Sequence, residues 1–161
     1  MNEVFLILLI SGISFSSDYF TVKDANLSSA SIELNIGEIS ILSDNEYHSL
    51  NSESDGKTQN IGEPELPTYS FNYSIESQKE YNVEIVSEEF DLYENINLIP
   101  VQPLLKVGQE KLFIKNDNLY NSNTIYPESN HSVKRMSMRG YELLNIEVIP
   151  FEYNLSTKQL K

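Results

Sequence analysis

The sequence predicts an all-β, antiparallel fold of sandwich or barrel-like form, on three observations. Apolar and polar residues alternate over several short stretches, which is the pattern of half-buried strands. Ten tyrosines and seven phenylalanines favour strands, whereas alanine, the best helix former, occurs only twice. Strands at about ten-residue spacing, separated by turn formers, are typical of antiparallel sandwiches and barrels.

The N-terminus predicts a secretory signal peptide at residues 1–16. Residues 4–10 are apolar, and small residues follow them up to Ser16. The run is too short to span a bilayer, so we expect no stable membrane span. The expected location is secreted, either extracellular or at the cell surface. Glu3 departs from the usual basic start of a signal peptide, and a buried first strand is the alternative.

The first half of the chain contains two strand patterns around a polar stretch. Residues 31–41 alternate and are interrupted at Gly37, which predicts a strand with a glycine bulge or tight turn. Residues 43–60 are polar and rich in turn formers, which predicts a loop. Residues 69–75 alternate again as a strand, and the prolines before them stiffen an extended entrance.

The second half continues with strands and turns. Tyr81, Val83 and Ile85 predict a strand over residues 79–92, and residues 95–105 predict a further one that ends in prolines. Residues 110–115 are a short strand or turn, and residues 116–129 are predicted as loop. In the last stretch Leu144, Ile146 and Val148 share one face of a strand, and Pro150 breaks its ladder.

Composition excludes several classes of function. The net charge of −13 repels phosphate, so no nucleic-acid partner is expected. The chain has no cysteine, which excludes disulfides, cysteine-based zinc sites and a cysteine nucleophile. No cofactor or metal motif occurs, so none is expected. His48 and His131 are interpreted as solvated loop residues, and the Glu88–Glu89 pair as solvated carboxylates, which leaves no catalytic residue.

Four stretches in order resemble the propeptides of gingipain-type secreted cysteine peptidases. They are "GEPELP" (62–67), "NINLIPVQP" (95–103), "TIYPES" (124–129) and "RGYELLNIEVIPFEYNLSTKQLK" (139–161). The matching positions, expected to be structural, are Gly62, Pro64, Leu66, Pro67, Pro100, Pro103, Tyr126, Pro127, Arg139, Gly140, Tyr141, Pro150, Tyr153 and Asn154.

The resemblance implies a non-catalytic prodomain at residues 17–161. Such a prodomain assists the folding of its cognate peptidase domain and inhibits it until proteolytic removal. The resemblance also implies that the domain is C-terminally incomplete and lacks its last strand, which leaves an unpaired edge near residues 146–154. The alternative is a stand-alone secreted β-sandwich that serves as an adhesion or surface module.

Lys106 is the candidate for the inhibitory contact. It follows a proline-stiffened stretch and precedes Gly108, which predicts a loop position. The resemblance implies a peptidase that cleaves after Arg or Lys, so a cationic side chain on a stiff loop would fit its acidic specificity pocket. Lys111 and Lys115 are the alternatives, and an ordinary exposed lysine remains a further interpretation.

Overall fold

The computed structural model of the chain describes residues 19–25, 29–77, 79–105, 108, 110 and 112–161. The predicted signal peptide lies outside these residues. Within them, nearly all regular structure is strand: β1 (Phe20–Ala25), β2 (Ala30–Leu34), β3 (Ser40–Asp44), β4 (Tyr47–Asn51), β5 (Gly56–Lys57), β6 (Pro67–Ile75), β7 (Ile125–Tyr126), β8 (His131–Met138), β9 (Tyr141–Val148), β10 (Tyr153–Asn154) and β11 (Gln159–Leu160), with one short helix, α1 (Asp117–Tyr120). The all-β class is confirmed, and the described strands form open antiparallel sheets rather than a closed barrel.

The chain divides into two compact units. Among the described residues, unit 1 contains 19–25, 29–35, 71–77, 79–83 and 133–146, and unit 2 contains 36–70, 84–105, 108, 110, 112–132 and 147–161. Strands β6, β8 and β9 run through both units. No helix in the described part of the chain is long and apolar enough to cross a membrane.

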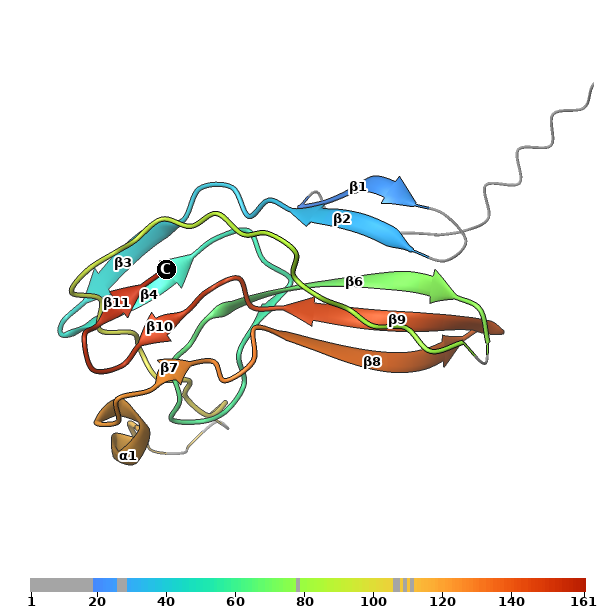
Figure 1. Cartoon of the computed structure of the whole chain (residues 1–161). Helices are drawn as coiled ribbons and strands as arrows, with labels where there is room; N and C mark the ends of the chain where they lie inside the picture. The colour runs from blue at the N-terminus through green and yellow to red at the C-terminus, as the bar shows by residue number, and fades with distance from the viewer. Residues whose placement is uncertain (1–18, 26–28, 78, 106–107, 109, 111) are drawn as a thin grey trace, which may run out of the picture. The chain divides into compact units, whose positions relative to one another are not determined.

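The largest sheet has the strand order β5-β6-β9-β8 (Figure 1). The alternation predicted β6 and β9, and both are confirmed. Tyr69 and Ile75 of β6 are buried, as are Leu144 and Ile146 of β9. Strand β8 is the exposed edge of this sheet.

A two-residue turn joins β8 to β9. Its central residues Arg139 and Gly140 have φ angles of 53° and 85°. Positive φ at both positions is the requirement of the tightest hairpin turns, and a glycine meets it without strain. The Arg-Gly pair of the resemblance thus sets the register of this hairpin.

Strands β1 and β2 form an antiparallel pair in unit 1, with a register shift between Val22 and Asp24. The ring of Phe20 contacts that of Phe71, with centroids 4.5 Å apart. The predicted strand around Gly37 is in fact two strands, because Gly37 adopts a φ of 66° and ends the extended run after β2. Strand β3 then pairs with β4 in a separate hairpin.

The sequence predicted a loop at residues 43–60, but the structure has strands β4 and β5 there. The turn formers serve a hairpin turn at Asn45, which has a φ of 54°. Leu50 supplies the apolar anchor of β4 and is 3% exposed. A single buried leucine among polar residues gave too weak an alternation to reveal the strand.

The strand predicted over residues 79–92 is wrong, because the described residues of this stretch form none. Its side chains are mainly exposed and include Glu84, Glu88 and Glu89. The stretch has the period of a strand but no ladder partner, and its clustered carboxylates oppose burial.

Residues 146–154 do not present the expected unpaired edge. Strand β9 lies between β6 and β8, and β10 lies between β11 and β7. Beyond the ladder, the backbone of Leu160 exchanges two hydrogen bonds with Tyr93, of 2.8 and 2.9 Å. The C-terminal residues are therefore integrated in unit 2.

Candidate functional site

The first two motifs of the resemblance pair with each other in unit 2. The backbone of Val101 exchanges hydrogen bonds with the 62–65 stretch, donating to Glu63 at 2.8 Å and accepting from Gly62 at 2.9 Å. The buried side chains between them are Pro64, Leu66, Pro67, Leu98 and Pro100, each less than 2% exposed. This buried layer holds the 95–103 stretch against residues 62–67.

Gly62 is buried and joins two segments. Its φ is 85°, its amide donates to Val101, and its carbonyl accepts from the amide of Asn116 at 2.9 Å. A Cβ atom here would lie 3.1 Å from the nitrogen of Asn116. Only glycine fits both the positive φ and the close backbone.

The side chain of Gln102 connects the 95–103 stretch to the segment that contains Ile114 and Asn116. Its Oε1 accepts a 2.9 Å hydrogen bond from the amide of Ile114, and its Nε2 donates a 2.7 Å bond to the carbonyl of Ile114. Nε2 also lies 2.9 Å from the carbonyl oxygen of Pro100. The side-chain amide of Gln102 thus makes two hydrogen bonds to the backbone of Ile114, as a neighbouring strand residue would, although the two residues are twelve apart.

Aromatic contacts hold the second segment. The ring of Phe113 lies against that of Tyr47 in β4, with centroids 5.2 Å apart. The ammonium group of Lys115 lies 4.9 Å from the centroid of the Tyr120 ring and 3.7 Å from a carboxylate oxygen of Asp117. Asn116 caps α1 by accepting from the amide of Leu119 at 3.2 Å.

Between Gln102 and Ile114 the described side chains are mainly exposed and apolar. Leu104 is 99% exposed, Leu112 68%, Phe113 52% and Leu105 46%. We call these four residues the contact arm. Exposed apolar clusters on a soluble chain mark interaction surfaces, because their burial against a partner is favourable.

The structure describes one of the three candidate lysines. Lys106 and Lys111 lie outside the described residues. The side chain of Lys115 is 30% exposed and is bound to Asp117 and the Tyr120 ring. Lys115 would have to give up both contacts to reach a partner.

The later motifs support the same unit. Tyr126 is buried in β7, and the bond to Pro127 is cis. Tyr153 is 1% exposed and donates a 2.8 Å hydrogen bond to the carbonyl of Ile96. Asn154 Oδ1 accepts from the amides of Ser156 and Thr157, at 3.1 and 3.0 Å, which builds the turn before β11. Pro103 and Pro150 are half-buried, and Tyr141 is exposed.

Burial perturbs the tyrosines of this unit. Loss of hydration raises the pKa of Tyr126 to about 12, with the carboxylate of Glu63 adding to the effect. Burial likewise raises the pKa of Tyr120 and of Tyr153. These hydroxyls therefore remain protonated at neutral pH and act as hydrogen-bond donors.

The sequence predicted that the two histidines lie in loops, but both lie in strands. His48 belongs to β4, and its Nδ1 accepts a 2.9 Å hydrogen bond from the amide of Asn97. His131 begins β8, where its Nδ1 lies 3.0 Å from Oδ1 of Asn130. In each case the ring nitrogen contacts an asparagine, which is a structural contact.

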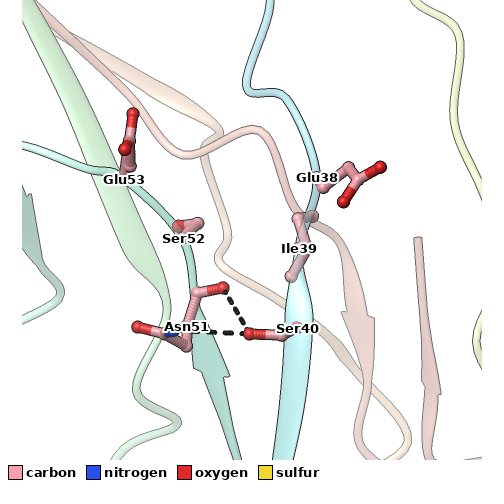
Figure 2. Close-up of a pocket in the computed structure, with 6 residues that line it drawn as sticks. All are labelled: Glu38, Ile39, Ser40, Asn51, Ser52 and Glu53. Atoms are coloured by element: carbon pink, nitrogen blue, oxygen red, sulfur yellow. Dashed lines mark hydrogen bonds between the residues drawn. The ribbon is translucent and has the colours of Figure 1, made fainter.

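In the described part of the chain, no group of three or more His, Cys, Asp or Glu residues could hold a metal ion. A hollow beside β3 and β4 is lined by Glu38, Ile39, Ser40, Asn51, Ser52 and Glu53. Figure 2 shows that its two carboxylates stand apart, while Ser40 Oγ donates to the carbonyl of Asn51 at 3.3 Å. The hollow therefore lacks the facing carboxylates of acid–base chemistry.

The sequence did not single out Gln102 or Phe113. Gln102 is part of the 95–103 motif, but a bond between a side chain and a distant backbone group leaves no periodic trace. The aromatic contact of Phe113 depends on β4, which was predicted as loop.

Comparison with known proteins agrees with this arrangement. No curated protein matches the chain. Two solved structures have the same fold. The complex of Porphyromonas gingivalis RgpB pro- and mature domains has a TM-score of 0.77 at 15% identity, with 90% of this chain and 79% of that chain covered. The structure on zymogenic latency of gingipain K from the same organism has a TM-score of 0.72 at 17% identity, with 93% and 91% covered.

The sequence itself decides the family. Propeptide_C25 matches residues 33–161, which is most of the chain and contains all four motifs. The chain accordingly belongs to the Propeptide_C25 family and is a non-catalytic prodomain.

Proposed function

We propose that this prodomain binds its cognate gingipain-type cysteine peptidase, assists its folding and keeps it inactive until proteolytic removal. The observation that carries the proposal is the family match over residues 33–161. The fold supports it, because a similar chain occurs in a complex of pro- and mature domains. The exposed contact arm supplies an apolar surface for such a partner.

The inhibitory contact in this proposal is a lysine near the contact arm. Lys106 is the first candidate, and Lys111 is the alternative. Lys115 is a weaker candidate, since its ammonium group is already bound to Asp117 and Tyr120. A cation in an acidic specificity pocket would block the substrate there, and the surrounding domain would cover the cleft.

The test is titration of the activated peptidase with the wild-type chain and with Lys106→Ala, Lys111→Ala and Lys115→Ala. Loss of a charge that fits a desolvated acidic pocket costs about 2–5 kcal/mol, which is roughly thirtyfold or more in inhibition constant. If the wild type inhibits and all three variants are equally potent, covering alone is the mechanism. If the wild type neither inhibits nor binds, the prodomain does not act in trans and the surface-module alternative gains.

The location in this proposal is outside the cell. The apolar residues 4–10 and the small residues after them are the sequence features that support export. Mass measurement on exported material should show a start near Ser17. Exported, folded protein that keeps Met1 would contradict cleavage of the leader.

A further inference from the structure

We propose that residues 84–92, which we call the acidic strip, are a docking surface for a basic, apolar patch on the cognate peptidase domain. The inference rests on the proposed function and assigns a contact made of other residues than the contact arm. The strip belongs to unit 2 and has no helix, strand or turn (the yellow-green trace in Figure 1). No backbone group of the strip bonds another residue in the part of the chain that the structure describes. Those groups are therefore available to a partner segment that lies alongside.

The apolar side chains of the acidic strip face solvent. Val86 is 81% exposed, Phe90 59%, Leu92 52% and Ile85 45%. All the residues from 84 to 92 are exposed, so the strip covers no core of its own. Burial of such a run of apolar side chains against a partner is favourable, because it removes their surface from water.

Contacts hold the acidic strip at its C-terminal end. Tyr93 follows it directly and exchanges backbone hydrogen bonds of 2.8 and 2.9 Å with Leu160. The ammonium group of Lys161 lies 4.9 Å from the centroid of the Phe90 ring. The strip is thus attached to the C-terminal strands of unit 2, next to its most exposed aromatic side chain.

A hollow lies beside the first half of the acidic strip. It is lined by Ile85, Val86, Ser87, Glu88, Asn130 and His131. A lysine or arginine of the partner suits this hollow. Its aliphatic stem would pack against Ile85 and Val86, while its charged end would reach the Glu88 carboxylate.

The charge of the acidic strip selects the kind of partner. Its four carboxylates make no ion pair with another described residue, and they belong to Glu84, Glu88, Glu89 and Asp91. The strip contains no basic residue. A second copy of the chain is a poor occupant, because two chains of net charge −13 repel each other. A basic patch on the peptidase gains both the charge contacts and the apolar burial.

The charge test measures binding of the chain to the mature peptidase at low and at high salt. Glu88→Lys reverses the charge at the hollow. Glu53→Lys is the matched control, since Glu53 is an exposed glutamate of the same unit and its substitution changes the net charge equally. Glu88→Lys should weaken binding about tenfold at low salt and less at high salt, because salt screens charge contacts. Glu53→Lys should leave binding within about twofold of wild type.

The apolar test uses Val86→Ser, which should weaken binding about fivefold at both salt concentrations, because two methyl groups lose their burial. Its control is Leu42→Ser, since Leu42 lies in β3 and is 54% exposed. Val86 and Glu88 are exposed, so both substitutions should leave the denaturant midpoint of the free chain unchanged. A variant that loses stability together with binding would indicate a structural role and overturn the docking role.

The remaining outcomes separate this inference from the proposed function. If the wild type inhibits and both strip variants bind as tightly as it does, the acidic strip is not a docking surface and the proposed function stands. If the wild type does not bind the peptidase, both fail. Sedimentation of the chain alone should show a monomer. A wild-type dimer that Glu88→Lys converts to a monomer would make a second copy the occupant and overturn the inference.

Discussion

The hydroxyl group of Tyr153 donates a 2.8 Å hydrogen bond to the carbonyl oxygen of Ile96, which lies 57 residues earlier in the chain. Both residues are buried. The bond connects β10 to the stretch that precedes the contact arm. Removing this bond therefore measures how much the C-terminal motif contributes to the stability of unit 2.

We expect Tyr153→Phe to destabilise the protein by about 1–3 kcal/mol, because the carbonyl of Ile96 stays buried and loses its donor. The ring remains, so packing is conserved. Urea unfolding followed by tyrosine fluorescence and circular dichroism measures the change. Tyr141→Phe is the control, since Tyr141 is 53% exposed and should change stability by less than about 0.5 kcal/mol. Equal effects of the two substitutions would show that the bond to Ile96 adds nothing.

Stability should fall in alkaline solution through the buried tyrosines. Burial raises the pKa of Tyr126 from 10.0 to about 12 in the folded state. Between these pH values the unfolded chain loses the proton and the folded chain keeps it, so unfolding becomes more favourable as pH rises. The contribution is complete below pH 10 and is lost at about 1.4 kcal/mol per pH unit up to about 12.

Urea unfolding at pH 8 and pH 11 measures this alkaline loss. Tyr126→Phe, which has no proton to lose, should show a smaller decrease between the two pH values than the wild type. The comparison is between the two decreases in the free energy of unfolding, so the direct effect of the substitution on stability cancels. Identical decreases would mean that the Tyr126 hydroxyl ionises equally well in the folded protein.

Gly62→Ala should be more harmful than Gly37→Ala. Both glycines have positive φ, at 85° and 66°, so each alanine incurs roughly 1–2 kcal/mol of backbone strain. Only at Gly62 does the new Cβ meet backbone, 3.1 Å from the nitrogen of Asn116, whereas nothing lies within 4 Å at Gly37. The crowding adds about 1–3 kcal/mol. The two variants are compared by denaturant midpoint, and a Gly37→Ala variant as unstable as Gly62→Ala would show that strain alone matters.

The sequence predicted the parts of the fold in which alternation and burial coincide. Tyr69, Phe71 and Ile75 alternate in β6 and are buried, and Leu144 and Ile146 do the same in β9. Residues 79–92 have the same alternation, but a strand also needs a neighbour, and periodicity carries no information about neighbours. Strand β4 is the opposite case: it has partners in β3 and in the backbone at Asn97 and Ile99, but its alternation was too weak to reveal it.

The candidate site was predictable only in outline. The proline-bounded stretch directed attention to residues 103–115, and their exposed apolar side chains agree with an interaction surface. The contacts that shape this site come from Gln102, Gly62 and Tyr47. Gln102 and Gly62 belong to the motifs, but the motifs do not show which residues they bond, and Tyr47 lay in a predicted loop. Their roles depend on tertiary distance, which a single sequence does not contain.

The bonds between Leu160 and Tyr93 impose an order of events on folding. Residues 93–96 obtain their partners from residues 153–160, which are synthesised later, and closing so long an interval is entropically costly and slow. Until then the backbone groups of Tyr93 are hydrated and unit 2 has no complete ladder at this position. Unit 2 thus reaches its native pairing at Tyr93 only after residue 160 is available, so the backbone of residues 93–96 stays unpaired while residues 97–159 are being synthesised.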